Sequence, residues 1–319
     1  MKHDQGYIWL LGSTGFIGEA LFRHLSAKNN YHLVLLLNRN MPFRRYEHHH
    51  VITGGMDGLD PLWLERFPPR IVFHMARPAG SNVLTRTLAA LRGETANTRM
   101  VSLLARLEKP PVVVYGSGSL VYGQQSRQKA ADENCLVNPL AFARYYYRNE
   151  IPWQDAAHGQ LSDVRFARPG WIVGPGSWFD AFFWKPYIHC GMVPYYGDGR
   201  QKMSLIHIDD CALMMETIGF RGEPNQVLNV FTGTPITQKD FAELMADILD
   251  TTTFNVSYAG TKRSYGHTTA MALTSSIPMA TIHQDIYDKL PLQYPNAETI
   301  LSDVIRILKK TKIYLSQPR

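Results

Sequence analysis

Three glycines spaced three residues apart, Gly12, Gly15 and Gly18, are the first residues whose type and spacing indicate chemistry. They follow a short apolar run and precede EALFRHLSAK, which has the spacing of an amphipathic helix. Such a turn brings backbone N–H groups and a helix N-terminus against a pyrophosphate. Gly12 would allow the tight turn, Gly15 the close approach of phosphates, and Gly18 the packing of helix on strand. The stretch predicts a dinucleotide site, and the alternative is an ordinary turn without a ligand.

The end of the second expected strand bears on the choice of dinucleotide. The run YHLVLLL is apolar almost throughout, as in strands buried on both faces. An acidic residue after such a strand binds ribose hydroxyls, whereas an arginine favours a 2′-phosphate. Arg39 follows this strand, and no acidic residue comes before Glu47. We therefore expect NADP(H) to be preferred, with NAD(H) as the alternative cofactor. The other interpretation of Arg39 is a solvated charge on a loop.

Composition and charge exclude several other classes. The 319 residues are 45% hydrophobic and 19% charged, which suffices for a full globular core. The net charge is +6, but apart from Arg39, Arg44 and Arg45 the basic residues are scattered, so we expect no nucleic-acid partner. No apolar stretch approaches the length of a membrane span, so we expect no membrane association. The three cysteines are far apart and odd in number, which favours a reducing compartment and a cytoplasmic location.

The histidines also fail to form a metal site. His48, His49 and His50 are adjacent, and neighbours on a strand point to opposite faces, so they cannot all reach one ion. No cysteine pair or second histidine cluster completes a ligand set. No metal is predicted.

Strands and helices alternate through residue 123, which favours an α/β protein with a doubly wound parallel sheet. The fourth expected strand lies within 70–80, and its end, Ala76 to Pro78, should lie beside the nucleotide. A helix is expected over 94–109, with apolar residues on one face. The other expected strands lie near 8–11, 31–40, 51–60 and 110–123.

The second half is less regular and is rich in aromatic residues. They flank loop glycines, so they form either a core or a partly exposed apolar pocket. We expect a dinucleotide-binding domain over residues 1–170, with a returning strand near 204–232, and a smaller substrate-binding part over 171–203 and 233–319. The aromatic residues are Trp178, Phe179, Phe182, Phe183, Trp184, Tyr187, Tyr195 and Tyr196.

Seven stretches stand out in order along the chain. They are GSTGFIG (12–18), VFHMA (72–76), Asn97 at the start of a helix, VVVYGSGSLVYG (112–123), RFARPGWIVGPG (165–176), GDGRQKMSLIHIDDCA (197–212) and VLNVFTGTPITQKDFAEL (227–244). In order and spacing they resemble the extended short-chain dehydrogenase/reductases, the group of nucleotide-sugar epimerases, dehydratases and related reductases. The resemblance runs from residue 7 to about 250, and the remaining residues match only loosely.

This resemblance implies a Rossmann fold that binds a nicotinamide dinucleotide. The glycine stretch would line the pyrophosphate, Arg39 would approach the adenosine ribose, and Ala76 the nicotinamide-side ribose. Residues 169–172 would form the loop over the nicotinamide, and the acidic pair of HIDD (207–210) would open a helix and anchor a loop. The implied cofactor-binding residues are Gly12, Ser13, Thr14, Gly15, Phe16, Ile17, Gly18, Arg39, Ala76, Asn97, Pro169 and Ile172.

The catalytic residues of the family are where this chain differs. The family uses a serine or threonine after the fifth strand and a Tyr-x-x-x-Lys pair on the next helix, with a glutamate four residues after the lysine. Aligning on Glu150 puts Tyr146 at the lysine position and Phe142 at the tyrosine position. There is no lysine between Lys129 and Lys185, so no Tyr-x-x-x-Lys exists here in any register. The usual proton-transfer pair is absent, and losing one such contributor costs about 10² to 10⁴ in rate.

Nearby hydroxyl groups are the candidates for replacement chemistry. Ser117 and Ser119 flank the family's serine position, and Tyr145 and Tyr146 lie on the following helix. We take Ser117, Tyr145 and Tyr146 as the candidate catalytic residues. The alternative for the tyrosines is packing between helices, since in the family this helix and the one around 97–108 often form a dimer face. A homodimer is therefore a candidate assembly.

The sequence favours an NADP(H)-binding oxidoreductase, a reductase or dehydrogenase that acts on a small apolar or aromatic metabolite with divergent catalytic residues. Hydride transfer to an iminium-like centre would need no tyrosine donor, because the substrate itself carries the charge. Two alternatives remain. One is a catalytically silent relative that serves as a sensor or partner subunit. The other is a non-redox isomerase or cyclase on the same fold.

Overall fold

The computed structural model describes residues 6–37, 46–77, 80, 83–125 and 129–316. Arg39, predicted to approach the adenosine ribose, lies outside the described residues. The chain folds into two compact units. The first falls within residues 1–121, 141–168 and 212–228, and the second within 122–140, 169–211 and 229–319.

A seven-stranded sheet forms the centre of the first unit and confirms the predicted doubly wound α/β fold. The strands are β1 (Tyr7–Leu11), β2 (Leu33–Leu37), β3 (His50–Thr53), β4 (Pro69–His74), β5 (Val112–Gly116), β6 (Val164–Pro169) and β10 (Val227–Val230). Their order is β3-β2-β1-β4-β5-β6-β10, and the neighbouring pairs from β3 to β6 are parallel. The chain therefore builds outward in both directions from β1 and β4. The carboxyl ends of these two strands form the topological switch point, where open α/β sheets bind ligands.

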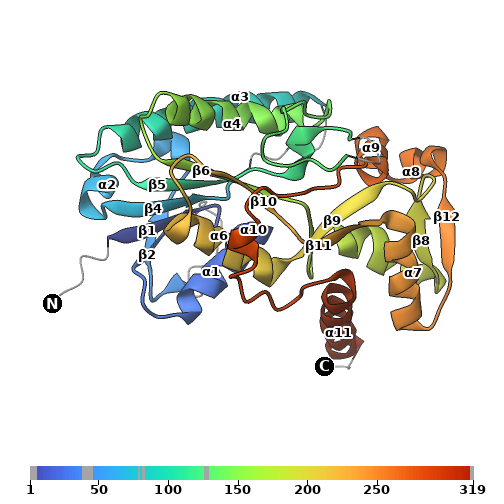
Figure 1. Cartoon of the computed structure of the whole chain (residues 1–319). Helices are drawn as coiled ribbons and strands as arrows, with labels where there is room; N and C mark the ends of the chain where they lie inside the picture. Colours follow the sequence, from blue (N-terminus) through green and yellow to red (C-terminus); the bar gives the residue numbers. More distant parts are fainter. Residues whose placement is uncertain (1–5, 38–45, 78–79, 81–82, 126–128, 317–319) are drawn as a thin grey trace. The chain divides into compact units, whose positions relative to one another are not determined.

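Helices cover both faces of this sheet (Figure 1). They are α1 (Phe16–Ala27), α2 (Leu62–Arg66), α3 (Val83–Ala105), α4 (Arg144–His158) and α6 (Ile208–Arg221), with 3₁₀ turns η2 (Met56–Gly58) and η3 (Ser119–Tyr122). α3 and α4 run side by side over one face, and α1 and α6 lie over the other. The central strands are buried on both faces because their apolar runs are continuous, and Trp9, Val72 and Val113 are fully buried.

The helix expected over 94–109 is longer than predicted. α3 begins at Val83, so Asn97 lies in its middle and not at its start, which corrects the prediction for this residue. The prediction missed the first part of α3. Leu84, Leu88 and Leu91 have helical spacing, but all three are exposed, so this apolar stripe faces away from the core.

The second unit contains two small sheets. β7 (Trp171–Val173), β9 (Lys202–His207) and β11 (Thr232–Thr237) form one, and β8 (Val193–Tyr196) and β12 (Thr253–Val256) form the other. A π-helical turn, η4 (Asp180–Trp184), precedes the helices of this unit. These are α5 (Lys185–Cys190), α7 (Gln238–Leu249), α8 (Tyr258–Tyr265), α9 (His267–Thr274), α10 (Gln284–Tyr287) and α11 (Ala297–Ser316).

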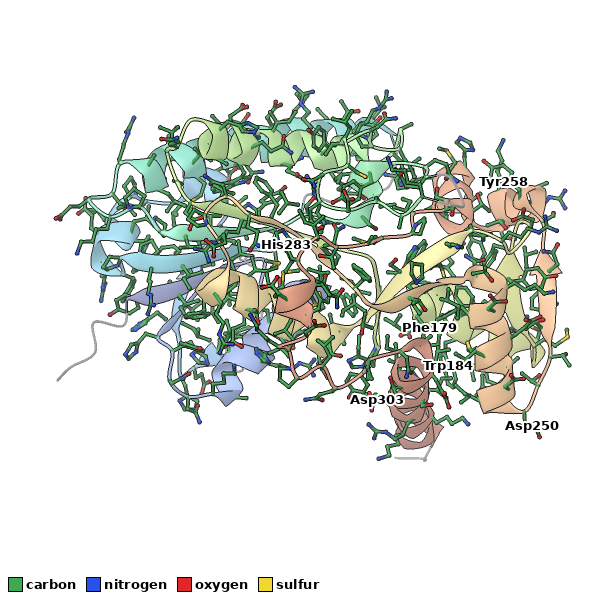
Figure 2. The ribbon with its side chains drawn as sticks, viewed as in Figure 1. Phe179, Trp184, Asp250, Tyr258, His283 and Asp303 are labelled. Carbon is green, nitrogen blue, oxygen red and sulfur yellow. The ribbon has the colours of Figure 1, made fainter. Side chains whose placement is uncertain are left out.

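The aromatic cluster of the second half is mainly core. Phe179 and Phe183 are fully buried and pack with Phe241 of α7, with ring centroids 6.1 and 5.1 Å from it. Phe179 and Trp184 are labelled in Figure 2. Trp178 and some neighbouring rings are only partly buried, but they pack against the same cluster. Of the two interpretations left open by the sequence, the structure supports a packed core.

The acidic pair at 209–210 has the structural role that the resemblance implies. Asp209 and Asp210 lie in the first turn of α6. The Asp210 carboxylate accepts hydrogen bonds from the backbone nitrogens of Gln293 and Tyr294, each at 2.9 Å. Asp210 thus anchors the loop that leads to α11. Within the described residues, no helix combines the length and the apolar character needed to cross a membrane.

Candidate functional site

The loop between β1 and α1 carries the three glycines. Gly12 has a φ of +81°, and a β-carbon there would lie 2.5 Å from the backbone nitrogen of Ala76. A β-carbon on Gly18 would overlap the carbonyl oxygen of Gly12. At Gly15 the nearest atom would be that same oxygen, at 3.3 Å. Gly12 and Gly18 are thus required by the turn and its packing, whereas Gly15 leaves the start of α1 accessible to a ligand.

A cleft of about 600 Å³ opens over this loop, at the carboxyl ends of β1 to β4. Four of the predicted cofactor-binding residues line it: Gly12, Thr14, Gly15 and Ala76. Arg77 also lines it, as expected from the end of the fourth strand. The side chain of Ser13 is fully buried, and Phe16, Ile17 and Gly18 are not among the lining residues, so their predicted contacts with the dinucleotide stay predictions. The remaining lining residues are Leu11, Leu36, Gly54, Gly55, Met56, Asp57 and Met75.

The segment after β3 was missed as part of this site. Asp57 presents a carboxylate to the cleft, where it can accept a hydrogen bond from a nucleoside hydroxyl or amino group. Gly54 has a φ of +144° and leads the chain around the cleft. The signal was available in the sequence, since VITGGMDG places two glycines and an acid directly after an apolar run.

A second, smaller cavity of about 30 Å³ lies at the end of β5. It is lined by Arg77, Tyr115, Gly116, Ser117, Gly118, Leu120, Val121, Ala143, Tyr146, Asn149 and Glu150. Arg77 therefore borders both the cleft and this cavity.

The buried carboxylate of Glu150 forms part of the cavity wall. The Ser117 hydroxyl donates a hydrogen bond to Glu150, and both residues are almost fully buried. Gln154 Nε2 donates to the other carboxylate oxygen at 2.9 Å, and Arg168 Nη2 lies 3.5 Å from that oxygen. Burial raises the pKa of Tyr115, and the charge on Glu150 raises it further. The Tyr115 phenol therefore stays protonated.

The three consecutive tyrosines differ in their surroundings. Tyr146 lines the cavity, and the guanidinium carbon of Arg77 lies 5.7 Å from its ring centre. Tyr147 donates its hydroxyl proton to Gln154 at 3.1 Å, and Tyr145 is not among the lining residues. Of the predicted catalytic residues, the structure brings Ser117 and Tyr146 to one cavity, and Tyr145 is not part of it. Their catalytic roles stay predictions.

Asn97 belongs to a polar cluster in the interior. Its side-chain oxygen accepts hydrogen bonds from His74 Nε2 at 2.7 Å and Trp153 Nε1 at 3.0 Å. Its amide donates to Asn149 at 3.3 Å, and the residue is only 2% exposed. Burial lowers the pKa of His74 to about 4, so this imidazole is neutral. The amide of Asn97 therefore joins α3 to β4 and α4, and its predicted contact with the dinucleotide stays a prediction.

Two predicted cofactor residues fall in the second unit. Pro169 ends β6, and Ile172 is a buried residue of β7. β7 pairs with β9, with Ile172 opposite Ile206. Their predicted position over the nicotinamide stays a prediction.

The sequence matches the family described as the NAD dependent epimerase/dehydratase family over residues 8–230. The chain belongs to this family, as the resemblance implied. This match begins in β1 and ends with β10, so it spans the whole central sheet.

Individual relatives are distant in sequence. The epimerase family protein YfhF of Bacillus subtilis is 23% identical over 265 residues, which cover 76% of this chain and 79% of the relative. The structure of the human epimerase family protein SDR39U1 with NADPH has a TM-score of 0.76 and 18% identity, covering 94% of this chain and 99% of that one. The structure of dTDP-glucose 4,6-dehydratase from Bacillus anthracis in complex with NAD has a TM-score of 0.77 and 15% identity, covering 97% and 98%. These likenesses show the fold.

Proposed function

We propose that the protein is an oxidoreductase that binds NADP(H) in the cleft over the glycine loop and acts on a small metabolite beside the Ser117 cavity. The observation that carries this proposal is the position of Arg77, which borders both the cleft and the cavity. A ligand in the cleft would thus end beside Ser117 and Tyr146, two of the candidate catalytic residues. When bound, a reduced nicotinamide supplies the hydride.

The residues of the cleft fit a dinucleotide. Gly15 leaves the N-terminus of α1 open, and backbone N–H groups there favour phosphate oxygens. Asp57 offers an acceptor for the nucleoside end. Family membership supports this assignment, and the two structural relatives were solved with NADPH and with NAD. The preference for NADP(H) rests on Arg39 and on the absence of an acid between it and Glu47.

The proton that accompanies hydride transfer would come from a hydroxyl group of the cavity. Tyr146 is our first candidate donor, because its hydroxyl has no hydrogen-bond partner among the residues that the structure describes and is thus available to a substrate. The Ser117 hydroxyl already donates its one proton to Glu150, so it would position the substrate by accepting a hydrogen bond from a substrate hydroxyl. This arrangement would replace the tyrosine and lysine pair of the family with a tyrosine and an arginine from different elements.

The expected apolar substrate loses part of its support. That expectation came from the aromatic cluster of the second half, and its central rings fill the core. The cavity at the end of β5 instead presents several polar groups. Their chemistry gives a more specific indication of the substrate, which we develop below.

Titration calorimetry with NADPH and NADH tests the cofactor assignment. We expect NADPH to bind more tightly, and Gly15→Asp to weaken binding at least about 100-fold, because a carboxylate would face the phosphates at the start of α1. Gly260→Asp in the first turn of α8 makes the same change away from the cleft and should leave binding unchanged. Failure of the unmodified protein to bind either dinucleotide would refute the proposal. Tighter binding of NADH would refute only the role given to Arg39.

The hydrogen bond between Ser117 and Glu150 favours one further candidate, a non-redox isomerase or cyclase. A buried carboxylate that accepts a proton from a hydroxyl can serve as a general base without any cofactor. Turnover that persists after complete removal of dinucleotide would favour this function over the oxidoreductase. A catalytically silent relative would instead bind NADPH without consuming it in the presence of any carbonyl compound, which the absorbance of the reduced nicotinamide reports.

A further inference from the structure

Some polar side chains around the small cavity are hydrogen-bonded to other protein groups, and others are available to a ligand. Ser117 and Glu150 bond to each other, and Asn149 donates to the Tyr145 carbonyl oxygen at 2.9 Å while it accepts from Asn97. The guanidinium of Arg77 and the hydroxyls of Tyr115 and Tyr146 remain. Among the residues that the structure describes, neither hydroxyl has a hydrogen-bond partner. The groups available to a ligand are therefore hydrogen-bond donors.

Backbone carbonyl oxygens fix one nitrogen of the Arg77 guanidinium, and its other nitrogens stay available. Its Nη2 donates to the carbonyl oxygen of Ser117 and lies 3.4 Å from that of Gly116. These contacts fix the guanidinium at the end of β5, with its carbon 5.7 Å from the ring centre of Tyr146. Within the described part of the chain, Nε and Nη1 have no partner. A planar guanidinium with two free donors is suited to bidentate contact with a carboxylate.

The charges around the cavity leave Arg77 without a counter-ion. Glu150 is the one carboxylate that lines the cavity in the described chain, and its oxygens face Ser117, Gln154 and Arg168. No acidic side chain of the described residues forms an ion pair with Arg77. Arg77 is exposed, and among the described residues it has unpaired donors next to two unpaired phenols, so it attracts an anion.

We propose that Arg77 and Tyr115 form a receptor for a carboxylate group, and that the substrate of the proposed hydride transfer carries one, while Tyr146 stays available as the proton donor. This inference rests on the proposed function and names its substrate class. Because Arg77 also lines the cleft, the carboxylate of the substrate would bind next to the dinucleotide. The carbon that accepts or gives up hydride would then lie close to the carboxylate, as in an α-keto, α-hydroxy or α-imino acid.

Ligand-observed saturation-transfer NMR on the NADPH-saturated protein tests the proposal with matched probes. Acetate and benzoate carry the carboxylate, and acetamide and benzamide keep their shape without the charge. We expect the carboxylates to bind and the amides not to bind. Arg77→Gln should weaken benzoate binding about ten- to a hundred-fold, and Tyr115→Phe by less, because a neutral donor contributes less than a charged one. Arg77→Lys keeps the charge but loses the fork and should fall between wild type and Arg77→Gln.

Arg92→Gln on α3 is the control, because Arg92 is exposed, carries the same charge and lines neither the cleft nor the cavity. Equal binding of benzoate and benzamide, or equal behaviour of Arg77→Gln and Arg92→Gln, would overturn the inference. Displacement of benzoate by NADPH would also overturn it, since Arg77 would then bind the dinucleotide. Calorimetry with NADPH on the same samples separates the two proposals. If NADPH does not bind, the proposed function fails, whereas if it binds and carboxylates do not, only this inference fails.

Discussion

The Ser117 hydroxyl donates a hydrogen bond to the Glu150 carboxylate, and this contact joins the end of β5 to the middle of α4. Arg168, near the end of β6, faces the same carboxylate. The glutamate that the family places after its catalytic lysine is thus present here without the lysine. Glu150 has a structural role that does not depend on a lysine, since it connects three elements around the cavity. We infer that Glu150 is a positioning residue that fixes the rotamer of Ser117.

Glu150→Ala should destabilise the protein by about 3–5 kcal/mol, because it removes the carboxylate that the buried Arg168 guanidinium faces. Glu150→Gln should cost about 1–3 kcal/mol, because its side-chain oxygen can still accept from Ser117. Urea unfolding at pH 7 measures both values, with Glu108→Ala at an exposed turn as the control. An alanine variant as stable as the control would contradict the role given to Glu150.

His74 makes the stability of the first unit depend on pH. Burial lowers the pKa of His74 to about 4 in the folded chain, against 6.5 for an unperturbed histidine. Between these values the unfolded chain binds the additional proton, so stability falls as the pH drops below 6.5, by about 2 kcal/mol at pH 5. His74→Gln keeps a donor for Asn97 and should flatten this slope in urea unfolding from pH 7.5 to pH 5. The exposed His158→Gln should retain it, and a wild-type stability constant over this range would contradict the prediction.

The central sheet was predictable because its signals are local. Each strand is an apolar run, and the glycine stretch that follows β1 needs its residue types for reasons of backbone space alone. Local pattern also predicted that Ala76 and Arg77 lie beside the nucleotide, and the structure places both on the cleft over the glycine loop. Pro78, the third residue of that prediction, lies outside the described residues.

The small cavity was less predictable because it depends on which strands are neighbours. β4 and β5 pair so that His74 lies opposite Tyr115, and this brings Arg77 beside Ser117. The sequence named Ser117 and Tyr146 from their spacing to family motifs, but nothing local connects either residue with Arg77. Likewise, the aromatic residues around Phe179 could be assigned to core only once Phe241, distant in the sequence, was seen to pack among them.

Glu216 should stabilise the folded chain at neutral pH, and this contribution should be lost in acid. Burial would raise the pKa of Glu216, but hydrogen bonds from His24, Lys28 and Tyr31 outweigh it and lower that pKa to about 2. The folded-state value lies below the ordinary 4.5, so the contribution is present above pH 4.5 and is lost as the pH falls toward 2. At pH 7, Glu216→Gln should cost about 2 kcal/mol in urea unfolding, and the difference from wild type should shrink by pH 3. The exposed Glu223→Gln is the control, and a difference that does not depend on pH would contradict the assignment.

The candidate homodimer can be tested at the outward face of the first part of α3. Leu84, Leu88 and Leu91 are 76%, 54% and 39% exposed and lie four and three residues apart, so they share one face of the helix. If two copies pair through this face, Leu88→Glu would place a carboxylate in the interface twice and raise the dimer dissociation constant at least about 100-fold. Leu136→Glu alters a leucine that is 90% exposed elsewhere and should leave assembly unchanged. Sedimentation equilibrium distinguishes the outcomes, and a monomeric wild type, or a dimer that tolerates Leu88→Glu, would exclude this face as the interface.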